Sequence, residues 1–138
     1  MRNSRYRYSR LVMIVGSVGW AIAGLIMTAN PDDAVSYLGL SSDVNILWAF
    51  RTAGVIALAF AVHMGTTSRQ AADKPFRRTA LFMVLFEIAI VALTYSAPGR
   101  FTSGRWVVVI SGVLFALLYL ITLPIKSIGY KEGEISNS

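Results

Sequence analysis

The sequence predicts an all-α protein: an integral membrane four-helix transmembrane bundle with both termini in the cytoplasm. Of the 138 residues, 55% are apolar and only 14% are charged, whereas soluble domains are about one quarter charged. Four apolar segments of roughly 19 to 23 residues are each long enough to cross a ~30 Å hydrocarbon layer as a helix. They lack the polar–apolar alternation of barrel strands. This composition argues against a water-soluble enzyme or a nucleic-acid-binding protein.

The apolar segments define four spans in a single membrane domain, residues 1–138, with no internal repeat. The spans cover residues 11–29, 44–66, 79–97 and 106–125. The first and fourth contain no charged residue, whereas the second contains Arg51 and His63 and the third contains Glu87. Because the first apolar run is longer than the core of a typical signal peptide, we expect it to remain as a span.

Helix-capping residues mark several boundaries. Asn30 and Pro31 are typical of the start of a helix, and they predict a short interfacial helix over residues 31–39. Ser42 and Asp43 can cap the second span.

The distribution of basic residues predicts the orientation. Ten of the thirteen Lys and Arg residues flank the spans on one side: Arg2, Arg5, Arg7, Arg10, Arg69, Lys74, Arg77, Arg78, Lys126 and Lys131. Because cytoplasmic flanks carry an excess of positive charge, we expect both termini and the loop between the second and third spans to be cytoplasmic. The expected location is the cytoplasmic (inner) membrane of the cell, which the chain crosses several times.

Small residues form a regular row on the second span. They recur every four residues: Ala49, Ala53, Ala57, Ala61 and Gly65. Small side chains allow a neighbouring helix to approach closely in lipid. We therefore predict that this ridge contacts another helix over much of its length, within the bundle or at a subunit interface, and we expect a homo-oligomer.

The spans contain a candidate polar site. With a rise of ~1.5 Å per residue, Glu87 lies ~12 Å from the cytoplasmic boundary, Trp20 ~14 Å, Tyr119 ~9 Å and Arg51 ~22 Å. Because a charged group inside a membrane is costly, we expect Glu87 to point into the bundle. We also expect it to be largely protonated at neutral pH unless Arg51 reaches it. Trp20 and Tyr119 are nearer to its level and can donate hydrogen bonds to it.

The remaining candidate residues have simpler interpretations. Arg51 can extend its side chain towards the outer surface. His63 lies ~5 Å from the cytoplasmic edge, and a single histidine does not make a metal site, which needs three or four ligands. The chain contains no cysteine and no phosphate-binding loop or nucleophile motif. We therefore predict no metal and no cofactor.

In size, span number and single intramembrane glutamate, the chain resembles the small multidrug exporters, which work as dimers. That family carries its glutamate in the first span, whereas Glu87 is in the third, so no residue role is transferred. The topology and the Arg-Thr-Ala-Gly stretch at residues 51–54 are also similar to small four-helix bacterial membrane proteins of unassigned function.

Three functions are compatible with these features. The first expectation is a non-enzymatic accessory or assembly component whose partners are the lipid bilayer and either a second copy or another membrane protein. The alternative is a transporter or channel for protons, cations or a lipophilic solute that uses Glu87 and Arg51. The third is a lipid-modifying, isomerase-like enzyme in which a buried carboxyl group shuttles a proton. No nucleic acid is expected as a partner.

Overall fold

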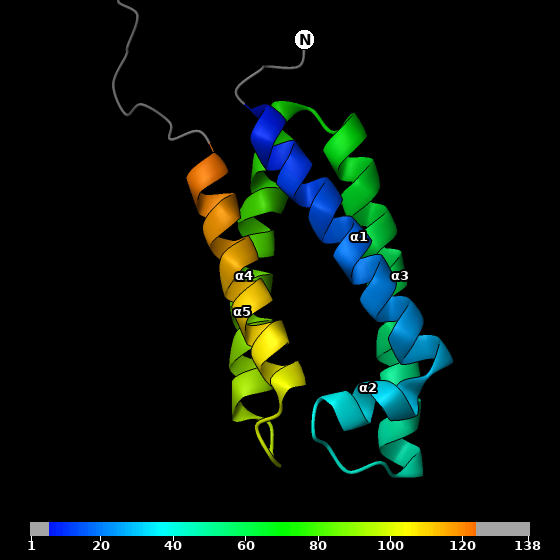
Figure 1. The fold of residues 1–138 in the computed structure, drawn as a ribbon. Helices are drawn as coiled ribbons and strands as arrows, with labels where there is room; N and C mark the ends of the chain where they lie inside the picture. The colour runs from blue at the N-terminus through cyan, green and yellow to red at the C-terminus, as the bar shows by residue number, and fades with distance from the viewer. Residues whose placement is uncertain (1–5, 124–138) are drawn as a thin grey trace, which may run out of the picture.

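The computed structural model of the chain describes residues 6–123, in which all regular structure is helical (Figure 1). The helices are α1 (Arg7–Ala29), α2 (Pro31–Tyr37), α3 (Val44–Gln70), α4 (Asp73–Ser96) and α5 (Ser103–Thr122). The four longer helices are long and apolar enough to cross a membrane. The prediction of an all-α chain with four such helices is therefore confirmed.

The helix ends differ from the ends of the predicted spans. α1 begins four residues before the first span, α3 continues to Gln70, and α4 begins six residues before the third span. α5 covers residues 103–122, and the predicted end of the fourth span, at Ile125, lies outside the described residues, as do Arg2, Arg5, Lys126 and Lys131. Hydropathy marks the part of a helix that suits lipid, whereas the backbone hydrogen bonds continue into the polar flanks.

Side-chain caps begin two of the long helices. The Asp43 carboxylate accepts a hydrogen bond from the backbone N–H of Asn45 at 2.9 Å, at the start of α3. The Thr102 hydroxyl accepts one from the backbone N–H of Arg105 at 3.4 Å, at the start of α5. Asn30 precedes α2 as expected, but its side chain makes no capping bond.

The long helices form two pairs. α1 packs along α3, and α4 packs along α5, whereas contact between the pairs is mainly between α1 and α5. α3 and α4 are joined by only Ala71 and Ala72, and their backbones come close at few points, although Phe60 of α3 packs against Phe86 of α4. Figure 1 shows that the pairs lie closest near this connection and diverge towards the end that holds α2. We call the end with the α3–α4 connection the basic end.

The backbones of α1 and α3 touch at two glycines. A Cβ atom on Gly54 would lie 2.8 Å from the carbonyl oxygen of Gly24 and 2.8 Å from the backbone nitrogen of Thr28. A Cβ atom on Gly24 would lie 2.9 Å from the carbonyl oxygen of Gly54. Because real Cβ atoms do not approach other atoms this closely, only glycine fits at this crossing.

Within one copy of the chain, the predicted alanine ridge is buried only in its middle. Ala57 and Ala61 are each 5% exposed, but Ala49 and Ala53 are exposed and Gly65 is half-buried. In a helix of 3.6 residues per turn, a row with a spacing of four turns by ~40° at each step. The ridge therefore winds away from α1, and the buried face follows a mixed spacing: Gly54, Ala57, Ala61, Met64 and Ser68. The homo-oligomer stays a prediction.

A hydrophobic core joins the two pairs near the basic end. Its buried members come from all four long helices and the residue after α5: Met13, Met64, Phe76, Ala80, Met83, Val84, Ala116, Tyr119 and Leu123. Beside it, the Ser9 hydroxyl donates a 2.6 Å hydrogen bond to the carbonyl oxygen of Thr122. The two pairs are therefore packed together more closely at the basic end than at the opposite end.

Candidate functional site

Glu87 lies on α4 at the contact between the two helix pairs. Its side chain is 5% exposed. Its Oε1 atom accepts a hydrogen bond from the indole N–H of Trp20, with a donor–acceptor distance of 3.3 Å. Trp20 belongs to α1, so this bond links one pair to the other. Within residues 6–123, no basic side chain forms an ion pair with Glu87.

Tyr119 on α5 completes the polar cluster. Its side chain is fully buried, and its hydroxyl has no hydrogen-bond partner within the described residues. A Cβ atom on Gly16 of α1 would lie 3.5 Å from this hydroxyl, and Trp20 packs against the core that contains Tyr119. A Cβ atom on Gly112 would lie 3.4 Å from Oε2 of Glu87. Glu87 therefore lies among neutral groups. One of these groups, the Tyr119 hydroxyl, has no hydrogen-bond partner within the described residues.

Two aromatic rings, those of Phe60 and Phe86, lie beside the Trp20 indole that binds Glu87. The ring centroids of Trp20 and Phe60 are 5.9 Å apart, those of Trp20 and Phe86 5.4 Å, and those of Phe60 and Phe86 4.8 Å. Aromatic faces attract organic cations, and a carboxylate supplies the opposite charge. This arrangement suits the exchange of a proton on Glu87 for a cation.

Of the other candidate polar residues, Arg51 and His63 lie outside this cluster. Both are exposed on α3, and Arg51 makes no hydrogen bond or ion pair within the described residues. The backbones of α3 and α4 come close at few points, and the pairs diverge away from the α3–α4 connection. Arg51 is near the far end of α3, so it does not reach Glu87.

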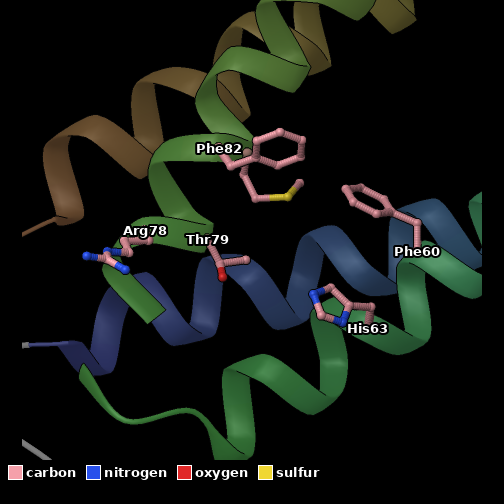
Figure 2. Close-up of a pocket in the computed structure, with 6 residues that line it drawn as sticks. Phe60, His63, Arg78, Thr79 and Phe82 are labelled. Atoms are coloured by element: carbon pink, nitrogen blue, oxygen red, sulfur yellow. The ribbon is translucent and has the colours of Figure 1, made fainter. Parts of the chain in front are cut away.

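A pocket of about 300 Å³ lies between α3 and α4 near the basic end. It is lined by Phe60, His63, Arg78, Thr79, Phe82 and Met83. Figure 2 shows His63 and Thr79 facing each other across the opening, with Phe60 and Phe82 together on one side and Arg78 on the other. Phe60 also belongs to the aromatic cluster, so the pocket lies next to the Glu87 site.

Two buried arginines were missed as structural residues by the sequence analysis. Arg105, in the first turn of α5, is 1% exposed. Its guanidinium donates hydrogen bonds to the carbonyl oxygens of Leu38 and Ala97, each at 2.6 Å, and to that of Pro98. A cation in the first turn of a helix is repelled by the positive end of the helix dipole. The position of Arg105 in the sequence therefore indicates that its guanidinium needs hydrogen-bond acceptors to compensate.

Arg10, at the basic end, is the second buried arginine whose guanidinium donates hydrogen bonds to backbone carbonyl oxygens. Its guanidinium donates to the carbonyl oxygens of Ser68 at 2.8 Å and Ala71 at 2.7 Å, and to Asp73 at 3.2 Å. It also lies over the ring of Phe76, with 4.5 Å between Cζ and the centroid. Arg10 thus binds α1 to the α3–α4 connection, and no local feature of the sequence marks this role.

Neither metal ligands nor known relatives guide the assignment of a function. Among residues 6–123, no group of three or more His, Asp or Glu side chains could hold a metal ion. Comparison with protein-family models, with curated proteins and with solved structures gave no match. The site is therefore interpreted from its own chemistry.

Proposed function

We propose that the chain spans the cytoplasmic membrane four times with both termini in the cytoplasm. The length and hydropathy of α1, α3, α4 and α5 support this placement, as do large exposed apolar side chains on every long helix. Of the nine Lys and Arg residues in the described part, six lie at the basic end: Arg7, Arg10, Arg69, Lys74, Arg77 and Arg78. By the positive-inside rule, the basic end is cytoplasmic.

This orientation predicts opposite labelling of two introduced cysteines. The chain has no cysteine of its own, and Ser41 and Ala72 are exposed in loops at opposite ends of the bundle. In intact cells, a membrane-impermeant maleimide should label Ser41→Cys and leave Ala72→Cys unmodified until the membrane is permeabilised. Labelling of Ala72→Cys alone in intact cells would show the reverse orientation.

Within this placement, we infer that the protein transports a proton in exchange for a cationic, lipophilic solute, with Glu87 as the shared binding group. The observation that carries this inference is that Glu87 is buried between the two helix pairs with only neutral partners. Carboxylates inside a membrane are costly unless paired or protonated. A Glu87 without a basic partner is suited to release its proton when a cation arrives and to take one up when the cation leaves.

The helix pairs offer a means of access. Contact between them is slight compared with the contact inside each pair, and the Trp20–Glu87 hydrogen bond crosses that contact. Movement of one pair against the other would give a solute access to the Glu87 carboxyl group, as rocking movements give access to the binding sites of secondary transporters. The rings of Trp20, Phe60 and Phe86 would then face the apolar part of the solute.

The proposal predicts that a lipophilic cation binds at Glu87. Tetraphenylphosphonium serves as the probe, with binding to the detergent-solubilised chain measured by titration calorimetry. Glu87→Gln should weaken binding by about tenfold or more, because a charged partner is worth about 1.5–3 kcal/mol. Binding to the parent should also weaken as the pH falls, since a proton competes for the same carboxyl group.

The matched control is Asp33→Asn, which makes the same charge change at an exposed position on α2. It should bind the probe as the parent does. Equal binding by Glu87→Gln and the parent would contradict transport through Glu87. The Trp20–Glu87 bond would then be a structural contact, in keeping with the accessory or assembly role.

A further inference from the structure

The pocket between α3 and α4 has its polar and apolar walls arranged in order of depth. His63 is seven residues before the end of α3 and Arg78 five residues after the start of α4, which places them ~10 and ~8 Å from the helix ends. Phe60 and Phe82 lie deeper, at ~15 and ~14 Å. The polar groups lie near the helix ends and the apolar groups lie deeper. A phospholipid has the same order in its leaflet, with the headgroup at the surface and the acyl chains below it.

The polar wall has unused donors and a positive charge. Within residues 6–123, the side chains of Arg78 and His63 form no hydrogen bond and no ion pair. No acidic residue lines the pocket. Asp73, the described acid at the basic end, is bonded to Arg10. The charge of this wall therefore complements a negatively charged ligand.

We propose that this pocket binds an anionic phospholipid of the cytoplasmic leaflet. Arg78 binds the headgroup phosphate, with the His63 imidazole on the opposite wall, and the upper part of an acyl chain packs against Phe60 and Phe82. Phe82 is 58% exposed, so the acyl chain can enter sideways between two helices whose backbones come close at few points. Basic pockets between membrane helices on the cytoplasmic side bind such headgroups. The proposal rests on the membrane placement but not on transport by Glu87.

Trp20 provides a local reporter of the occupant, because its ring contacts that of Phe60, which lines the pocket. Trp48 and Trp106 are exposed near the other end, and replacing both with Phe leaves Trp20 as the single tryptophan. This variant is reconstituted in phosphatidylcholine nanodiscs. A fixed fraction of the lipid is either dibrominated phosphatidylglycerol or dibrominated phosphatidylcholine, whose bromines quench nearby tryptophan fluorescence.

We expect the quenching titrations to give about a fivefold preference for phosphatidylglycerol, as one cation near an anionic surface provides. Arg78→Gln should reduce the preference to nearly one, and Arg78→Lys should retain most of it. Arg69→Gln is the matched control, because it removes an exposed arginine at the same end outside the pocket. It should keep the preference.

Three results would overturn the proposal. The first is equal quenching by the two brominated lipids in the parent. The second is the same loss of preference in Arg69→Gln as in Arg78→Gln, which would assign it to the general charge of the basic end. The third is no quenching by either lipid, which would show that no acyl chain reaches the side of the pocket next to Trp20. Glu87→Gln should keep the lipid preference, so failure of the transport proposal can be told apart from failure of this one.

Discussion

Replacement of Arg105 by Met is expected to lower the free energy of unfolding by about 3 kcal/mol or more. The guanidinium is almost fully buried and donates hydrogen bonds to carbonyl oxygens of Leu38, Ala97 and Pro98. Met would leave these acceptors without their donor, and each buried acceptor without a partner costs about 1–3 kcal/mol. Because Leu38 follows α2 while Ala97 and Pro98 follow α4, the end opposite the basic end would lose its main link.

Thermal unfolding in detergent micelles, followed by circular dichroism, measures this effect. Arg100→Met is the matched control, because Arg100 lies in the loop just before α5 and is exposed. It should melt close to the parent. Arg105→Lys keeps the charge but cannot reach all three acceptors at once, so it should fall between the parent and Arg105→Met. Equal melting of Arg105→Met and Arg100→Met would show that the carbonyl oxygens find other donors.

Replacement of Gly54 by Ala should cost about 1–3 kcal/mol, as overpacking in a tight contact does, and Gly54→Leu should cost more. A Cβ atom at this position meets the backbone of Gly24 and Thr28 on α1. Backbone atoms cannot turn aside as a flexible side chain can, so α1 and α3 would have to move apart. The loss of close packing along the pair is the physical reason for the penalty.

Gly19→Ala on α1 is the control for the glycine effect. No atom lies within 4 Å of a Cβ atom built on Gly19. Alanine favours a helix over glycine by about 1 kcal/mol, so this variant should melt at or above the temperature of the parent. Unfolding experiments in which Gly54→Ala and Gly19→Ala behave alike would reject the close backbone contact between α1 and α3.

The sequence predicted the levels of the site residues along the helices, because the rise per residue is constant. The constant rise puts Trp20, Glu87 and Tyr119 at similar depths. In the structure a hydrogen bond joins Trp20 to Glu87, and Trp20 packs against the core that contains Tyr119. The rise per residue says nothing about which helices are neighbours. Whether Arg51 could reach Glu87 depended on how α3 lies against α4, and the backbones of these helices come close at few points.

What the sequence determined by itself is the number, length and polarity of the long helices, since hydropathy and backbone geometry act along the chain. What only the tertiary structure decided is the pairing of α1 with α3 and of α4 with α5, the crossing at Gly24 and Gly54, and the burial of Arg10 and Arg105. Apolar helix faces are nearly equivalent in hydropathy, so the choice between them depends on shape. The Ser68 and Ala71 acceptors of Arg10 and the Leu38 acceptor of Arg105 are distant in sequence, so only the tertiary fold brings them to the guanidinium groups.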